Sequence, residues 1–243
     1  MPQYQHYVPN FILRQFSTNY VRPQEPKREN YADEQFIVDK KKFEKAKKKE
    51  NKKAKVNIVN FKDGFAKGRI EESRCNNTFG RPVMYNDDIE AKLSRLENQA
   101  SEIIYAIDAD FIRGAEETKL SETQKSILLK FFITMFYRNR DTSDMFGRDW
   151  HDLDLDDREP IYDYMVENGI STPRDVWLKT LEAFIDIDLS QPQDVYSGWL
   201  IENGFPDHAR GFCEQLCDGT FYICTPNDNK DEFVLTQNVY IFA

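Results

Sequence analysis

The sequence predicts an α+β fold that is mainly α-helical, with a central antiparallel helix pair and a small β region that includes a C-terminal hairpin. Residues 87–111 and 121–136 repeat apolar side chains every three or four positions, which indicates amphipathic helices. Residues 56–61 and 232–242 are instead rich in β-branched and aromatic side chains, which is typical of strands. We expect all 243 residues to form one domain.

The N-terminal part is predicted to hold one short helix followed by a basic loop. Apolar side chains between residues 8 and 16 fall close to one helical face, and Pro9 suits an early turn of a helix. Residues 39–56 contain ten lysines and little apolar material. Such a composition is typical of a solvated loop, which we expect to lack fixed structure without a partner.

The β region is expected to combine a strand at residues 56–61 with a hairpin at the C-terminus. An Asp-Gly turn signal follows the first strand. The hairpin is predicted to pair residues 220–225 with residues 232–242 across the turn-forming cluster 226–229.

The central helix pair has start and stop signals at both members. Asn86 or Asp87 can cap the first helix, and Gly114 can end it. Ser121 and Gln124 fit a capping box at the start of the second helix, because each side chain can satisfy the other's backbone donor. We expect the two helices to pack antiparallel at the centre of the fold.

The segment after the pair is predicted to be a linker and a series of short helices. Residues 149–159 concentrate five Asp and one Glu, and we interpret them as an acidic linker. Short helices are expected at residues 160–168, from Thr172-Pro173 onward, at 194–203 and at 206–217.

Composition and cysteine use indicate a cytoplasmic protein. The formal net charge of −9 argues against a surface that is basic throughout, although a local basic patch remains compatible with it. No apolar run is long enough to cross a bilayer, and the chain starts without a signal segment. Cys213 and Cys217 lie four residues apart, which is wider than the usual paired spacing of zinc ligands. We therefore expect free thiols, no metal, no cofactor and no membrane partner.

Three stretches of the chain resemble the family catalogued as domain of unknown function 4238. Residues 6–16 read HYVPNFILRQF, similar to the family's opening H-Y-V-P-Q-F-Y/L-L-R-x-F. Glu97 and the FYRN run at 136–139 match a Glu and a "hydrophobic-x-Arg" on the helix pair. Residues 233–239 read FVLTQNV, similar to F-I/L-T-S-D-N-P-V. Here Gln237 replaces the family's Asp, which puts any role of that Asp in doubt.

The resemblance implies an activity as well as a fold. Fungal proteins of similar sequence include arginine-containing cyclodipeptide synthases, which take two aminoacyl-tRNAs and release a cyclic dipeptide of arginine with a second amino acid. The resemblance therefore implies aminoacyl-tRNA as the partner of this chain. Family members usually continue well past this point, so we expect the C-terminus to be truncated.

Three residues are the candidates for catalysis. His6 is a possible general base, because its unperturbed pKa lies near neutral pH. Glu97 falls on the apolar stripe of the first central helix, where a carboxylate must be paired or protonated. Arg138 ends the second helix and is a natural partner for Glu97. The pair is either a structural bridge between the helices or the lining of a pocket that binds a cationic group and a carboxylate or phosphate.

Further residues are candidates for binding. The motifs that carry the resemblance contribute five substrate-binding candidates: Tyr7, Arg14, Asn139, Thr236 and Asn238. The basic run contributes candidate contacts to the phosphate backbone of a nucleic acid: Lys47, Lys48, Lys49, Lys52 and Lys53.

The function that we expect is that of a tRNA-dependent synthase joining arginine and a second amino acid into a cyclic dipeptide. A nucleic-acid-processing enzyme, such as a nuclease-like defence or toxin effector, is the first alternative. A non-catalytic interaction module is the second. The sequence contains no G-x-S-x-G nucleophile motif and no phosphate-binding P-loop.

Overall fold

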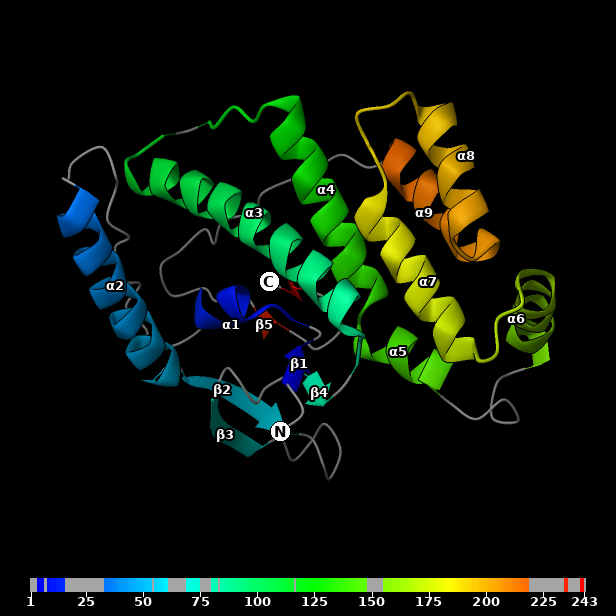
Figure 1. Cartoon of the computed structure of the whole chain (residues 1–243), viewed down its shortest axis with the longest axis horizontal. Helices are drawn as coiled ribbons and strands as arrows, with labels where there is room; N and C mark the ends of the chain where they lie inside the picture. Colours follow the sequence, from blue (N-terminus) through cyan, green and yellow to red (C-terminus); the bar gives the residue numbers. More distant parts are fainter. Residues whose placement is uncertain are drawn as a thin grey trace. The chain divides into compact units, whose positions relative to one another are not determined.

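The computed structural model describes residues 4–6, 8–15, 33–53, 55–60, 69–74, 80–82, 84–115, 117–147, 155–218, 234–235 and 241–242. The chain forms two compact units, Met1–Pro82 and Val83–Ala243 (Figure 1). The expectation of a single domain over all 243 residues stays a prediction.

The first unit combines two helices with two strand pairs. Its elements are β1 (Tyr4–His6), α1 (Asn10–Gln15), α2 (Asp33–Lys53), β2 (Lys55–Asn60), β3 (Arg69–Arg74) and β4 (Gly80–Pro82). Strand β1 pairs antiparallel with β4, and β2 pairs antiparallel with β3. Helix α1 packs on β2, and its Leu13 is buried, as is Val8 just before it. The predicted helix within residues 8–16 and the predicted strand at 56–61 are therefore present.

The basic run is a helix, so the prediction of a loop at residues 39–56 is wrong. Helix α2 extends from Asp33 to Lys53 (Figure 1). Its described lysine side chains are exposed. Lys, Glu, Gln and Ala all have high intrinsic helix propensity, because their side chains lose little freedom in a helix. The prediction relied on apolar periodicity, which a helix surrounded by water does not need.

The second unit is a helical assembly followed by one short strand pair. Its elements are α3 (Asp87–Ile112), α4 (Glu122–Tyr137), α5 (Arg140–Gly147), α6 (Leu155–Asn168), α7 (Pro173–Asp186), α8 (Gln193–Asn203), α9 (Pro206–Asp218), β5 (Val234–Leu235) and β6 (Ile241–Phe242).

The predicted packing of the two helices against each other is confirmed. Helices α3 and α4 pack against each other, and both begin at the expected caps. The side-chain oxygen of Asn86 accepts a hydrogen bond from the backbone N–H of Ile89 at 2.8 Å. Ser121 and Gln124 exchange side-chain-to-backbone hydrogen bonds at 2.9 and 3.2 Å, which completes the capping box.

The helix with the most neighbours is α7, which the sequence did not single out. It packs against α3, α4, α5, α6 and α8 (Figure 1). Trp177 is 1% exposed, and its indole N–H donates to the backbone carbonyl of Tyr137 at 3.3 Å. Thr172 caps the helix and Pro173 occupies its first turn, as predicted. The core of the second unit is therefore built around α7.

One hydroxyl group on α7 fixes the corner between α8 and α9. The Thr180 hydroxyl donates to the carbonyl of Val176 and accepts from the backbone N–H of Phe205, both at 2.8 Å. At Gly204 an added Cβ would lie 3.2 Å from the carbonyl oxygen of Leu200 and 3.3 Å from a methyl carbon of Thr180. A side chain at residue 204 would therefore make contacts tighter than usual at this corner.

The predicted α+β fold class, with one β region, is wrong. The described residues between 84 and 218 form helices and connecting turns without a strand. The described strands form three separate two-stranded pairs: β1 with β4, β2 with β3, and β5 with β6. These pairs do not join into a common sheet, so the strand at 56–61 shares no β region with the C-terminal strands.

The predicted C-terminal hairpin is also wrong. Val234–Leu235 pairs with Ile241–Phe242, so both strands come from the single long strand expected at residues 232–242. Residues 220–225, its expected partner, lie outside the described residues. The polar run of Thr236, Gln237 and Asn238 interrupts the apolar residues of the long segment. Composition alone did not distinguish one strand from two that pair with each other.

The acidic linker is shorter than predicted, because α6 begins at Leu155 rather than at Pro160. Asp156 and Asp157 lie in its first turn, where negative charge interacts favourably with the helix dipole. Residues 149–154, the rest of the predicted linker, lie outside the described residues.

Candidate functional site

Glu97 and Arg138 form an ion pair inside the second unit. The Arg138 guanidinium donates from Nη2 to Glu97 Oε1 at 2.6 Å. The side chain of Arg138 is 2% exposed, whereas that of Glu97 is 26% exposed. The predicted contact between these residues is confirmed. Their catalytic role stays a prediction.

Glu90 adds a second carboxylate to this pair. It lies two helical turns before Glu97 on α3, and therefore on the same side of that helix. Burial raises the pKa of Glu90, the negative charge of Glu97 raises it further, and Arg138 opposes both effects. We call Glu90, Glu97 and Arg138 the α3–α4 charge cluster.

Arg138 remains charged in this position although it is buried. Burial by itself lowers the pKa of the guanidinium, but interactions with Glu97, Tyr85 and Glu90 outweigh it and raise the pKa overall. The Nε of Arg138 is buried without a hydrogen-bond partner among the described residues. The cluster thus holds two carboxylates against one guanidinium that has spare donor capacity.

The position of Arg138 follows from the corner between α4 and α5. The apolar stripe of α4 ends at Tyr137, and Arg138 is the C-cap residue. The side-chain oxygen of Asn139 then accepts from the backbone N–H of Thr142 at 2.8 Å, which caps α5. Asn139 therefore has a structural role here, and its predicted role in substrate binding stays a prediction.

Sequence reasoning missed Glu90 as a member of the cluster. The available signal was its spacing, because a carboxylate seven residues before Glu97 lies near the same helix face. Glu90 stands one residue after the buried Ile89, at the edge of the apolar stripe. The periodicity therefore allowed either a buried or a solvated position for it.

Some of the other predicted site residues belong to the first unit, and others lie outside the described residues. His6 lies in β1 opposite Gly80, and Arg14 lies in the last turn of α1, so both belong to the first unit. The expectation that His6 reaches the site of Glu97 stays a prediction. Tyr7, Thr236 and Asn238 lie outside the described residues.

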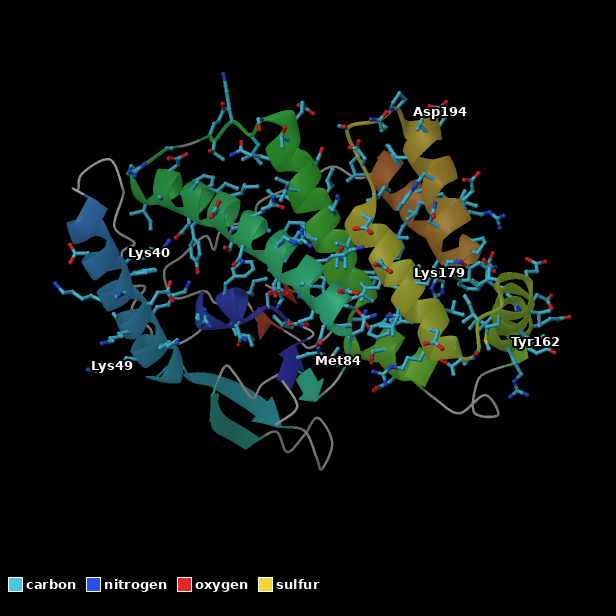
Figure 2. All side chains as sticks on the ribbon, in the orientation of Figure 1. Lys40, Lys49, Met84, Tyr162, Lys179 and Asp194 are labelled. Carbon is cyan, nitrogen blue, oxygen red and sulfur yellow. The ribbon has the colours of Figure 1, made fainter. Side chains whose placement is uncertain are left out.

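The predicted nucleic-acid contacts lie on helix α2. Lys47, Lys48 and Lys49 are exposed, and Lys47 Nζ lies 5.6 Å from the centre of the Phe43 ring. Figure 2 labels Lys40 and Lys49, which mark two turns of this helix that carry lysine side chains. Lys52 and Lys53 belong to the same helix by their backbone. The lysines of the basic run thus belong to one regular helix.

Neither a metal site nor a membrane span is found among the described residues. No group of three or more His, Cys, Asp or Glu side chains in the described ranges is arranged to hold a metal ion. Cys213 is a buried free thiol. No helix within the part of the chain that the structure describes is long and apolar enough to span a membrane.

Comparison with known proteins gives the family. A family model described as "Protein of unknown function (DUF4238)" matches residues 4–243. No curated protein and no solved structure gives a significant match. Because the match extends over nearly the whole chain, the two units and the α3–α4 charge cluster all fall within it. The chain belongs to the DUF4238 family of proteins of unknown function.

Proposed function

We propose that this chain is a tRNA-dependent synthase that joins arginine and a second amino acid from aminoacyl-tRNAs into a cyclic dipeptide. The observation that carries the proposal is the α3–α4 charge cluster, in which Glu90 and Glu97 together outnumber the single positive charge of Arg138. The motif resemblance at Glu97 and Arg138 adds support, because both residues stand at positions typical of the family.

The reaction needs a group that accepts a proton. The α-amine of one aminoacyl ester attacks the ester carbonyl of the other, a C–N bond forms, and the C–O bond to the tRNA ribose breaks. The proton lost by the amine must be taken up and then delivered to the ribose oxygen as it leaves. The free α-amine of the resulting dipeptidyl ester then attacks the remaining ester carbonyl in the same way. This second C–N bond closes the ring, and the second C–O bond to tRNA ribose breaks. Glu90, whose raised pKa makes it a stronger base than an ordinary carboxylate, suits this transfer.

The substrate needs a receptor for positive charge. An arginyl group carries a guanidinium, and every aminoacyl ester carries an α-amine before it reacts. Glu97 remains 26% exposed while it is bound to Arg138, so one face of the carboxylate can meet a second cation. Arg138 fixes the orientation of that carboxylate, because its own side chain is held by burial.

The tRNA needs a basic surface, although the protein as a whole is acidic. Helix α2 supplies a concentrated surface of this kind, with exposed lysines at 40, 41, 42, 45, 47, 48 and 49. Phosphate contacts by lysine are independent of base sequence and depend strongly on salt. Such contacts suit an enzyme that must accept tRNAs of different sequence.

The test is production of a small molecule in a heterologous host, followed by mass spectrometry. We expect an arginine-containing cyclic dipeptide from the native chain. Glu97→Gln should stay folded and lose about a hundredfold or more of product formation, because a charged receptor is removed without a change of shape. Glu102→Gln is the matched control, since Glu102 is exposed on the same helix and its loss should leave product formation unchanged.

Thermal melts separate a catalytic role of the pair from a purely structural one. If the pair is only a bridge, Glu97→Gln lowers the free energy of unfolding by about 1–3 kcal/mol, and product falls only with the folded fraction. A stable and fully active Glu97→Gln variant contradicts the role of Glu97. Breakdown of nucleic acid without any cyclic dipeptide selects the alternative, a nucleic-acid-processing enzyme, which the basic surface of α2 would also serve.

A further inference from the structure

A groove lies where α7 ends and α8 begins, within the second unit. Its volume is about 190 Å³, and it is lined by Asp186, Asp188, Gln191, Val195, Tyr196 and Trp199. None of these residues belongs to the α3–α4 charge cluster. In Figure 2 the label Asp194 marks the same end of α8, one residue before Val195.

One end of the groove carries two carboxylates that are held in place. Asp188 accepts hydrogen bonds from the backbone N–H of Ser190 at 3.0 Å, from the Ser190 hydroxyl at 2.7 Å and from the side-chain amide of Gln191 at 3.1 Å. These bonds lower the pKa of Asp188, so it is ionised at neutral pH. Asp186 is ion-paired with Lys92 of α3.

The charge of Asp188 is available to a ligand. Among the described residues it has no salt-bridge partner, whereas Asp186 shares the Lys92 ammonium with Glu182. Lys130 is near enough to interact with both aspartates through space, but its partial burial lowers its pKa. Asp188 is therefore oriented by its own loop and has no direct ion-pair partner among the described residues, whereas Asp186 is paired with Lys92.

The other wall of the groove is apolar and aromatic. Val195 and Trp199 are four residues apart on α8 and thus share a helix face, with Tyr196 beside them. Val195 is 50% exposed and Trp199 is 36% exposed, which is a high exposure for such side chains. A tryptophan ring beside carboxylates is the combination that recognises an organic cation, because the ring face attracts positive charge.

We propose that this groove binds the side chain of an arginine carried by a polypeptide partner. The planar guanidinium stacks on Trp199 and donates hydrogen bonds to Asp188, which is a geometry that an ammonium group does not reproduce. The methylene stem of the arginine lies along Val195 and Tyr196. The net charge of −9 attracts a basic partner over a distance.

The size of the groove indicates a side chain rather than a free small molecule. Pockets for small ligands commonly have volumes of about 300–1,000 Å³ and enclose most of the ligand surface. A groove of about 190 Å³ with half-exposed walls covers one side chain and leaves the backbone that carries it outside. A polypeptide partner contributes the remaining contact area around the groove.

The proposal is tested by nuclear magnetic resonance titration of the full chain with a short peptide. The probe carries one arginine between glycine and serine residues, and the readout is the indole N–H resonance of Trp199. The same peptide with citrulline, a neutral group of the same shape, is the control for charge. We expect the arginine peptide to shift the Trp199 resonance and not that of the buried Trp177, and the citrulline peptide to shift neither. Equal binding of the citrulline peptide overturns the proposal.

Two substitutions and one matched control locate the site. Asp188→Asn keeps an acceptor for Ser190 but removes the charge, and Trp199→Leu keeps an apolar side chain but removes the ring. Fluorescence polarisation of the labelled peptide should show binding weaker by about five- to thirtyfold for each. Asp194→Asn removes the same charge outside the groove lining and should leave the affinity unchanged.

The remaining outcomes also decide the proposal. If Asp194→Asn weakens binding as much as Asp188→Asn does, the attraction is non-specific and the site is rejected. If free arginine amide binds as tightly as the peptide, a polypeptide partner is rejected. Because every variant leaves Glu97 and Arg138 intact, failure here is distinct from failure of the proposed synthase activity.

Discussion

Helices α2 and α7 are both regular, but different forces hold them. Most of the side chains of α7 that face its neighbours are buried, and Trp177, Leu181 and Phe184 are at most 1% exposed. The described side chains of α2 are exposed or half-exposed. Packing against neighbouring helices thus stabilises α7, whereas α2 depends on the helix propensity of its residues.

The two helices therefore differ in how strongly their structure constrains their sequence. A helix that is held by packing tolerates few changes and fixes the positions of its neighbours. A helix that is held by propensity accepts any residue of similar propensity, so its sequence can be selected for charge. In this chain the packed helix supports the core and the solvated helix carries the basic surface.

The largest difference is expected for an aromatic residue removed from each helix. Trp177→Ala should lower the free energy of unfolding by about 3–5 kcal/mol, because it leaves a cavity in the core. Phe43→Ala in the half-exposed surface of α2 should cost less than about 1 kcal/mol. Urea denaturation followed by circular dichroism measures both. An equal cost at the two positions contradicts the contrast, since α2 would then be held by packing.

A second effect should separate binding from stability. Replacing Lys47, Lys48 and Lys49 by Gln keeps helix propensity while removing three charges. We expect weaker tRNA binding and a slope of log K against log salt that is shallower by about 2–3 units, with an unchanged melting temperature. Binding at a series of salt concentrations gives the slope.

The matched control for the α2 variant removes three exposed cations elsewhere. Arg113, Lys119 and Lys125 lie at the end of α3, before α4 and within α4. Their replacement by Gln should leave the salt slope almost unchanged. If both triple variants lose the same binding, the effect reports net charge alone, and α2 has no special role.

The smallest effect is expected from Glu90, whose carboxylate lies half-buried on α3. Burial raises the pKa of Glu90 above its ordinary value of 4.5, so the folded state holds its proton to higher pH than the unfolded state. The free energy of unfolding of the native chain therefore falls as the pH rises from 4.5 through the raised pKa. Glu90→Gln removes this loss.

Melting temperatures of the native chain and Glu90→Gln across that pH range test the expectation. The melting temperature of Glu90→Gln should increase relative to that of the native chain as the pH rises. The difference should become constant above the raised pKa. Glu102→Gln, exposed on the same helix, controls for the removal of one carboxylate. A difference for Glu90→Gln that is independent of pH contradicts the burial of this group in its neutral form.

Sequence reasoning succeeded where a local pattern determines the structure. The caps at Asn86, Ser121 and Thr172 depend on side chains a few residues from the groups that they bind, and all three are present. The contact between Glu97 and Arg138 was also predictable, because a carboxylate on an apolar stripe requires a partner. These features depend on residues within one element or in two consecutive elements.

The failures concern relations between distant parts of the chain. Apolar periodicity does not reveal that α7 lies among five other helices, because the pattern shows only that one face is buried. It also assigned the lysine run to a loop, since it detects burial and not helix propensity. The partner of each strand depends on contacts that no local pattern specifies, and the single β region was therefore wrong. The groove between α7 and α8 could not be predicted from the sequence, because it also depends on how separate elements pack.

The close packing at Gly204 fixes the C-terminal end of α8. At this corner the Thr180 hydroxyl accepts a hydrogen bond from the backbone N–H of Phe205, and an added Cβ at residue 204 would lie 3.2 Å from the carbonyl oxygen of Leu200. The groove residue Val195 lies nine residues before Gly204, about 13 Å along the helix axis. Because the corner and this wall of the groove belong to one helix, the direction in which α8 leaves the corner sets the position of Val195 relative to the aspartates. The width of the groove therefore depends on packing at a corner that lies outside the groove lining.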